Sequence, residues 1–316
     1  MPGAPEIAFV WEILTSADDG PGHRSRHCLV FDPAAKTIIL YGGIVWGTRD
    51  LLRADTWELR SRQWRRVRCS KSPPARHRGA MTYDRIRGNA VLFGGQGRFN
   101  NMLGDTWTYA NGQWQKWRGG WWPNRPSARC GHCLAFDEST GEVVLFGGIG
   151  WFDRPLGDTW LFDGSMWRPV AGPAPPARRY AAFAFDPALK GCVLHGGSED
   201  DHGRRMYGDA WIFRDHAWEP LGTKFDTDPR DDHGMQYHRG AGRLLMLEGT
   251  TGERGLLVRE AAGWRAVAAS PLHPRHQCSP LVWDDELGGL LLHGGEMRHG
   301  GPQFDKTLLL RVAAAS

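Results

Sequence analysis

Three histidines recur at matching places in the first, third and fifth of six sequence repeats. They are His27, His132 and His233, and each lies three residues after an arginine. The intervening repeats carry small residues there, Gly79 and Ala181. If the repeats form a ring, three imidazoles would meet near its axis with space around them. Such a set is suited to copper, iron or zinc, and it could polarise a carbonyl, activate a bound water or activate dioxygen.

Two thiols and one phenol accompany these histidines. Cys28 and Cys133 directly follow two of them, and Tyr180 lies in register near the same place in the fourth repeat. These three are the candidate catalytic residues, because thiols and phenols can serve as nucleophiles or bases. The alternative is that each histidine points between repeats and bonds neighbouring backbone, which would leave no metal site. The sixth repeat offers Cys278 or Ser279 at this position.

Arginines gather around the same positions. Six of them are candidates for substrate binding: Arg26, Arg76, Arg78, Arg129, Arg178 and Arg179. A ring of guanidinium groups beside a low-dielectric wall attracts carboxylate or phosphate. Four acidic residues enter the fifth repeat and would suit the positive end of a zwitterionic ligand: Asp226, Asp228, Asp231 and Asp232. The first arginine of each repeat has an alternative, structural role, in which it hydrogen-bonds loop carbonyls.

The elements that must position these residues follow a repeat of about fifty residues, a period typical of blades or solenoid turns. A Gly-Gly pair follows a short apolar run in each clear repeat, and the pairs begin at Gly42, Gly94, Gly147, Gly196 and Gly294. Most pairs precede an Asp-Thr-Trp or Asp-Ala-Trp triplet, and a second tryptophan comes seven residues after the first. The last interval between pairs is about double, so it contains a sixth, degenerate repeat.

The short apolar runs have the length and the β-branched or aromatic content of strands. Four strands fit each interval, but the last repeat supplies only three. A strand over Ile7 to Leu14 would complete it and leave no open sheet edge. The sequence therefore predicts an all-β, six-bladed propeller, with 1–316 as one domain. We expect the blades at 23–67, 75–117, 128–170, 177–221, 229–267 and 274–312, with the closing strand at 7–14.

With these motifs the chain resembles the kelch β-propellers, in which a paired glycine ends the second strand and an outer-strand aromatic residue packs between blades. The resemblance covers essentially all 316 residues. It implies that the loops joining blades share a face with the loops between second and third strands. The latter carry the aromatic candidates for substrate binding: Trp46, Phe99, Trp151 and Tyr207. Kelch propellers act as oxidases, lyase-like specifier proteins and protein-binding adaptors, so the fold leaves the function open.

Composition narrows the partners and the compartment. The net charge is only +4 and no Lys/Arg run or recognition helix is visible, so we expect no nucleic-acid binding. No apolar run approaches the ~20 residues of a membrane span and no secretory signal is evident, so we expect a cytoplasmic protein. Six irregularly spaced cysteines fit reduced thiols. No phosphate loop or dinucleotide fingerprint predicts a nucleotide cofactor. Nothing in the sequence indicates an oligomeric state.

Two functions from different classes fit these features. The first is a small-molecule enzyme, with or without a metal, that acts on an anionic or zwitterionic substrate at the propeller mouth. The second is a protein-interaction propeller that binds an acidic peptide segment through the same arginines, as the resemblance to kelch adaptors implies. A deep, enclosed mouth would favour the first function, and a shallow mouth would favour the second.

Overall fold

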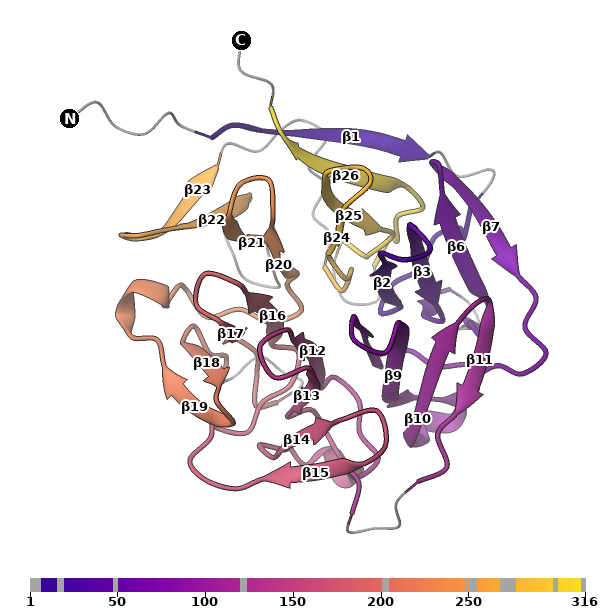
Figure 1. Cartoon of the computed structure of the whole chain (residues 1–316), viewed down its shortest axis with the longest axis horizontal. Coiled ribbons are helices and arrows are strands. Elements are labelled where there is room, and N and C mark those ends of the chain that lie inside the picture. Colours follow the sequence, from indigo (N-terminus) through magenta and orange to yellow (C-terminus); the bar gives the residue numbers. More distant parts are fainter. Residues whose placement is uncertain are drawn as a thin grey trace.

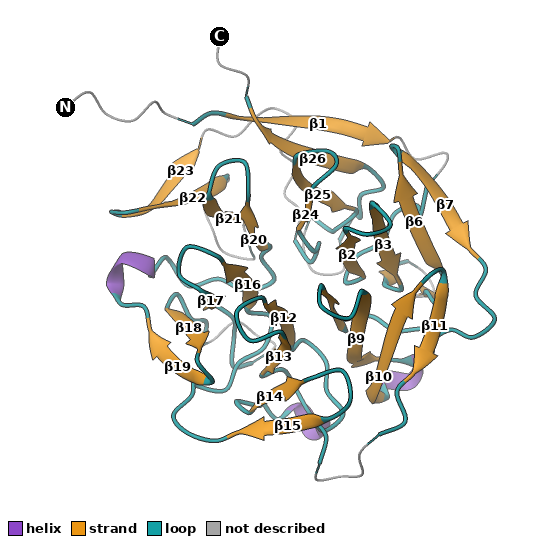
Figure 2. Cartoon of the chain, in the orientation of Figure 1, coloured by secondary structure: helices purple, strands orange, loops and turns teal. Residues whose placement is uncertain are grey.

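The computed structural model describes residues 7–15, 20–47, 51–119, 124–200, 205–247, 249, 255–267, 277–297 and 301–313. In these residues, six four-stranded antiparallel sheets stand around a central axis as the blades of a propeller (Figure 1). Strands and loops make up nearly all of the fold (Figure 2). The helices of this part are single 3-10 turns: η2 (Arg98–Asn100), η3 (Trp151–Asp153) and η4 (Thr223–Phe225).

The first three blades follow the chain outward from the axis. Blade 1 contains β2 (Cys28–Asp32), β3 (Thr37–Tyr41), β6 (Thr56–Arg60) and β7 (Gln63–Val67). Blade 2 contains β8 (Ala80–Asp84), β9 (Asn89–Gln96), β10 (Met102–Ala110) and β11 (Gln113–Lys116). Blade 3 contains β12 (Cys133–Asp137), β13 (Glu142–Phe146), β14 (Thr159–Phe162) and β15 (Trp167–Val170). A small hairpin of β4 (Ile44–Val45) and β5 (Leu51–Leu52) extends blade 1.

The other three blades complete the ring. Blade 4 contains β16 (Ala182–Asp186), β17 (Gly191–His195), β18 (Ala210–Arg214) and β19 (Ala217–Pro220). Blade 5 contains β20 (Met235–His238), β21 (Arg243–Leu247), β22 (Leu256–Glu260) and β23 (Gly263–Val267). Blade 6 contains β24 (Val282–Asp284), β25 (Gly289–His293), β26 (Thr307–Val312) and β1 (Phe9–Thr15).

The ring closes between the two ends of the described chain. Strand β1 pairs antiparallel with β26, from Phe9 opposite Val312 to Thr15 opposite Thr307. This confirms the predicted closing strand, which begins two residues later than the expected Ile7. All six sheets therefore have four strands, and the fold is the predicted six-bladed propeller.

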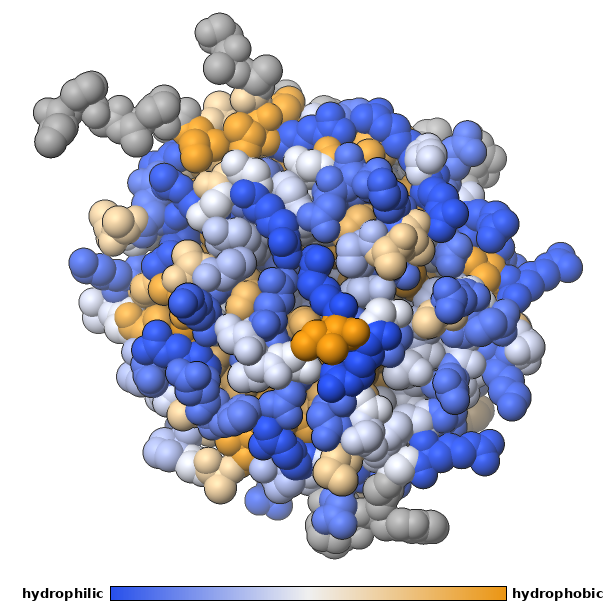
Figure 3. Space-filling model, in the orientation of Figure 1, coloured by the Kyte–Doolittle hydropathy of each residue, from blue (hydrophilic) through white to orange (hydrophobic). Residues whose placement is uncertain are grey.

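The two faces of the ring carry different connections. One face, which we call the hairpin face, carries the turns between first and second strands and is turned toward the viewer in Figures 1 and 3. The opposite loop face carries the connections between blades and those between second and third strands. Isolated bridges join the two kinds of connection, as between Ser25 and Ile44 or between Arg179 and Ser198. Among the described residues, no helix has the length and hydropathy needed to cross a membrane.

The tryptophan repeat holds neighbouring blades together. The indole N–H of Trp114 in blade 2 donates to Oγ1 of Thr56 in blade 1, at 2.9 Å. The same bond joins Trp167 to Thr106 at 3.0 Å and Trp218 to Thr159 at 2.8 Å. In each case the second tryptophan of one repeat bonds to the Asp-Thr-Trp threonine of the repeat before it. Each buried bond contributes about 1 kcal/mol, and the apolar rings fill the space between blades.

Candidate functional site

The mouth of the central channel on the loop face is framed by one residue from each blade. All six have a positive φ of between 52° and 62°: Arg26, Arg78, Gly131, Tyr180, Asp232 and Cys278. We call them the mouth ring. The backbone N–H of each donates to the carbonyl oxygen of its counterpart in the preceding blade, at 2.8–3.1 Å. Six peptide groups therefore bond to one another in a closed circle, which occupies their N–H groups.

A tyrosine and three arginines gather at the mouth ring. The centroid of the Tyr180 ring lies 5.1 Å from Cζ of Arg179. It lies 5.5 Å from Cζ of Arg78 and 5.7 Å from Cζ of Arg26. Guanidinium groups near an aromatic ring are attracted by its quadrupole. The structure therefore brings together three of the six arginines that the sequence predicts to bind substrate.

The charge of Arg26 is balanced inside the protein. Its Nη2 lies 2.9 Å from Oε1 of Glu296 and 3.6 Å from Oδ2 of Asp232. Glu296 is fully buried and also accepts a hydrogen bond from the Trp46 indole at 2.5 Å. Asp232, which we expected to face a zwitterionic ligand, thus faces Arg26. Arg26 therefore holds the mouth together, whereas Arg78 is only half-buried and can meet a ligand.

The three candidate catalytic residues are held in their neutral forms, with Cys28 buried and Cys133 and Tyr180 half-buried. Burial raises the pKa of Cys28 and the pKa of Cys133 to about 12 each. Burial also raises the pKa of Tyr180, although Arg78 and Arg26 oppose the shift. A thiol or phenol with a raised pKa is a poor nucleophile and a poor base at neutral pH. The site therefore offers these side chains as contacts and not as activated groups.

The first arginine of each of the first four repeats is structural, which corrects the prediction that Arg76, Arg129 and Arg178 bind substrate. Arg76 forms two hydrogen bonds with the Asp105 carboxylate, at 2.8 and 2.9 Å, and a third with the carbonyl oxygen of Gly94. The same set recurs for Arg24, Arg129 and Arg178. All four side chains are at most 1% exposed. Each one fastens the Gly-Gly turn to the Asp-Thr-Trp or Asp-Ala-Trp segment of its own blade, so it cannot also bind a ligand.

The three predicted metal ligands lie between blades, which corrects the expectation that they converge. Each ring contacts the residue that directly precedes the Gly-Gly pair of the preceding blade. The centroid distances are 5.9 Å for His27 and His293, 5.4 Å for His132 and Phe93, and 5.2 Å for His233 and His195. Among the described residues, no three His, Cys, Asp or Glu side chains are grouped so that they could hold a metal ion. The register of the mouth ring also places Ser279 at the histidine position of blade 6.

A groove of about 640 Å³ opens on the loop face beside the mouth ring. We call it the loop groove. Its walls include two arginines and four apolar side chains of blades 1 and 2: Arg78, Arg98, Ile44, Trp46, Leu51 and Phe99. Asp153 of blade 3 adds one acidic group. The groove is therefore basic and apolar, and it includes two of the four aromatic residues that were predicted to bind substrate.

The loop aromatic residues fall into two classes. Trp46 and Tyr207 are fixed by the protein itself: Trp46 donates to Glu296, and the Arg178 guanidinium lies 3.9 Å from the centroid of Tyr207. Phe99 is 99% exposed and Trp151 is 52% exposed. The second class presents the larger apolar surface to a partner.

The sequence reasoning missed a matched pair of turns on this face. The segments Gly97-Arg98-Phe99-Asn100 and Gly150-Trp151-Phe152-Asp153 both form 3-10 turns with a left-handed phenylalanine, at φ 57° and 61°. Phe152 is 99% exposed, like Phe99. The shared Gly-x-Phe spacing after each Gly-Gly pair was the available signal. It identifies Arg98 as an additional candidate for ligand contact.

Comparisons with known proteins agree with this architecture. No family model matches the chain. The chain is 31% identical to an F-box/kelch-repeat protein of Arabidopsis thaliana, over 50% of this chain and 36% of that protein. It is 34% identical to tRNA wybutosine-synthesizing protein 4 of Emericella nidulans, over 34% of this chain and 11% of that protein. The chain thus matches about a third of the plant relative and about a tenth of the fungal relative.

A solved structure extends the similarity to the whole ring. The structure of YjhT superimposes with a TM-score of 0.68 and 15% identity, covering 95% of this chain and 98% of that chain. At this identity the match concerns the fold alone. Together with the repeated Gly-Gly and tryptophan motifs and the similarity to a kelch-repeat protein, the six closed blades show that the chain has the fold of a six-bladed, kelch-type β-propeller.

Proposed function

We propose that this propeller is a protein-interaction module that binds an acidic peptide segment on its loop face. The observation that carries the proposal is the loop groove, in which Arg78 and Arg98 lie beside the exposed ring of Phe99. Arginine forms charge-assisted, bidentate hydrogen bonds with carboxylates, and an aromatic ring supplies apolar contact area. An extended segment with alternating acidic and apolar side chains would meet both kinds of group.

Because the mouth is closed on the loop face, it favours ligand binding at the surface over catalysis on a substrate that enters the channel from this face. The mouth ring is closed by six backbone hydrogen bonds and by side chains that contact one another. A ligand that approaches the loop face therefore meets the groove and not an open shaft. The pKa shifts of Cys28, Cys133 and Tyr180 supply no activated group for catalysis there.

The exposure of the matched turns also supports a binding role. Phe99 and Phe152 are both 99% exposed and both have a left-handed backbone, which non-glycine residues adopt at a cost of roughly 1–2 kcal/mol. A single exposed apolar residue is ordinary, but two in equivalent strained turns on one face indicate a selected surface. Contact with a peptide would remove these rings from water and stabilise the complex at roughly 25 cal/mol per Å².

The test is to measure the Kd of a fluorescein-labelled peptide of alternating glutamate and phenylalanine, against a lysine-phenylalanine peptide. Arg98→Gln and Phe99→Ser should each raise the Kd about tenfold, which corresponds to about 1.4 kcal/mol. Added salt should weaken binding of the wild-type protein, because the contact with Arg98 is solvent-exposed. The matched controls are Arg65→Gln and Ile86→Ser, which change exposed residues outside the groove. Equal affinity for the two peptides, or equal effects of groove and control variants, would reject the proposal.

A second candidate is the small-molecule enzyme acting on an anionic or zwitterionic substrate. The observation that favours it is the cluster of Tyr180 with three arginines, together with two relatives whose names refer to tRNA wybutosine synthesis. Its test is a thermal-shift screen of small carboxylates and amino acids with wild type and Tyr180→Phe. A shift that the variant loses would favour this candidate over peptide binding.

A cytoplasmic location belongs to the same proposal. All six cysteines are free thiols. Free thiols are typical of a reducing compartment, where structural disulfides are rare. Expression in the cytoplasm should give monodisperse, peptide-binding protein, whereas expression with a secretion signal should not.

A further inference from the structure

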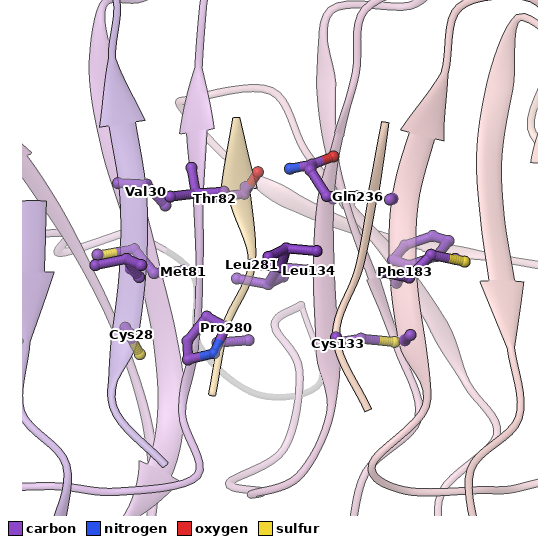
Figure 4. Close-up of a pocket in the computed structure, with 18 of the residues that line it drawn as sticks. Cys28, Val30, Met81, Thr82, Cys133, Leu134, Phe183, Gln236, Pro280 and Leu281 are labelled. Carbon is purple, nitrogen blue, oxygen red and sulfur yellow. The ribbon is translucent and has the colours of Figure 1, made fainter. Parts of the chain in front are cut away.

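The innermost strands of the six blades enclose a cavity of about 330 Å³ along the propeller axis. Figure 4 shows its side chains at successive levels between the two faces. One level is apolar and includes Met81, Leu134, Phe183 and Leu281. These residues occupy the same position in four different blades, three residues after the mouth ring, and Leu281 directly precedes β24. Their side chains make the middle of the channel hydrophobic.

The next level toward the hairpin face adds hydrogen-bonding groups. Thr82 and Gln236 lie there beside Val30 (Figure 4). Oε1 of Gln236 accepts the backbone N–H of Tyr237 at 3.0 Å, which leaves the side-chain NH₂ group for the channel. The Thr82 hydroxyl is a second donor at this level. The wall is thus apolar in the middle of the channel, and hydrogen-bond donors lie at the next level along the axis, toward the hairpin face.

Charged side chains line the channel only at its two ends among the residues that the structure describes there. The loop-face end has the mouth ring with Arg26, Arg78 and Asp232, and the hairpin-face end has Arg85, Glu138 and Arg239. A charged ligand in the apolar middle would lose its hydration without gaining an opposite charge. The channel therefore fits an uncharged molecule.

Four ion-paired side chains cross the channel at the hairpin face. They come from blades 2, 3, 5 and 6, and we call them the charge ring: Arg85, Glu138, Arg239 and Asp285. The distances around the ring are 3.3 Å for Arg85 to Glu138, 2.9 Å for Glu138 to Arg239, 3.9 Å for Arg239 to Asp285 and 3.8 Å for Asp285 to Arg85. Figure 3 shows hydrophilic residues near the middle of this face, with a hydrophobic residue beside them.

The two ends differ in how readily they can open. The mouth ring is made of backbone hydrogen bonds, so opening it would separate the blades. The charge ring is made of side chains that are 32–40% exposed. Ion pairs at such exposure add little stability, and exposed side chains change rotamer on the ps–ns timescale. The hairpin face is therefore the entrance.

We propose that the channel is a binding site for a small, uncharged, mostly apolar molecule with one hydrogen-bond acceptor, which enters through the charge ring. The cavity volume lies at the lower end of ligand pockets, so a single aromatic ring with a short substituent fits best. The acceptor would meet Thr82 and Gln236, and the ring would lie among Met81, Leu134 and Phe183. This site is separate from the loop groove and does not depend on the proposed peptide binding.

Acetophenone and benzoate provide a matched pair of probes, because they have similar size but only benzoate is charged. Isothermal titration should detect acetophenone at millimolar concentration and no benzoate. Met81→Trp, which fills the channel from a half-buried position, should abolish the signal. Gln236→Leu keeps a similar volume and should weaken binding severalfold by removing a donor. Peptide affinity should stay unchanged in both variants, which separates this site from the loop groove.

The entrance is tested by the association rate. Glu138→Gln removes two ion pairs of the charge ring, so acetophenone should bind faster with a nearly unchanged Kd. Absence of acetophenone binding to the wild-type protein, or equal binding by a folded Met81→Trp variant, would overturn the site. If Met81→Trp fails to fold, Gln236→Leu decides the matter, since an unchanged Kd there would contradict the assigned contact. An association rate unaffected by Glu138→Gln would overturn entry through the charge ring.

Discussion

Tyr180 lies directly against Gly131, its counterpart in the preceding blade: a Cβ on Gly131 would come within 2.6 Å of Cε1 of Tyr180. The glycine therefore makes room for the ring that the three arginines surround. Because Gly131 also has φ of 62°, two separate requirements favour glycine at this position.

Gly131→Ala should therefore destabilise the fold by about 1–3 kcal/mol, through steric overlap and backbone strain. Urea denaturation followed by tryptophan fluorescence gives the difference. The double variant Gly131→Ala/Tyr180→Ala should recover part of the loss, because only the overlap disappears. Full additivity of the two single effects would show that the residues do not press on each other.

Removing the Asp105 charge should weaken the fold mainly at neutral pH. Burial by itself raises the pKa of Asp105, but hydrogen bonds and ion pairing with Arg76 outweigh it, so the pKa lies below its ordinary value of 3.8. A depressed pKa gives stability that is present above the unfolded pKa and is lost as the pH falls through the folded pKa. Asp105→Asn leaves Arg76 buried without its counter-ion and should cost about 3–5 kcal/mol at pH 7.

The difference between wild type and Asp105→Asn should shrink as the pH falls below about 4. Unfolding curves at neutral pH and at acid pH measure it. Glu219→Gln, at an exposed ion pair, is the control and should change stability by less than about 1 kcal/mol. A pH-independent difference would mean that the Arg76 pair adds packing and no charge stabilisation.

His132 should remain neutral over the physiological range. Burial, followed by the Arg129 charge, lowers its pKa from 6.5 to about 3. The stability contributed by this group is therefore present above about pH 6.5 and is lost as the pH falls from there toward 3. NMR titration should show no shift of the His132 ring signals between pH 8 and about 5. Titration of His132 near its ordinary pKa would place it in contact with water and reopen its role as a ligand.

The thiols of Cys28 and Cys133 should resist alkylation in the folded protein. Burial raises their pKa values to about 12, so the thiolate fraction at pH 8 is about 10⁻⁴ of the total. Iodoacetamide labelling followed by mass spectrometry should modify them only after denaturation. Rapid labelling of Cys28 in folded protein would show that the channel admits polar reagents and that the thiol is activated.

Local repetition explains why the fold could be predicted in advance. Short-range patterns recur within each repeat: a Gly-Gly turn, a lead arginine and a pair of tryptophans. The structural role that the sequence allowed for the lead arginines is the one that Arg76 and Arg129 adopt. The closing strand followed from counting strands, because the last repeat lacked one. The matched turns at Phe99 and Phe152 were also visible in the spacing, although their full exposure was not.

The sequence by itself determined the six blades and the closure of the ring, because repeats of similar length must stack in the same way, and its resemblance to kelch propellers implied which loops share a face. Only the tertiary structure decided which groups meet across the axis. His27, His132 and His233 occupy equivalent places, yet each ring turns into the interface with the preceding blade, because the mouth ring directs its backbone at positive φ. In the charge ring, Glu138 pairs with Arg239, which lies about a hundred residues later in the sequence, and no local sequence pattern predicts a contact between residues so far apart.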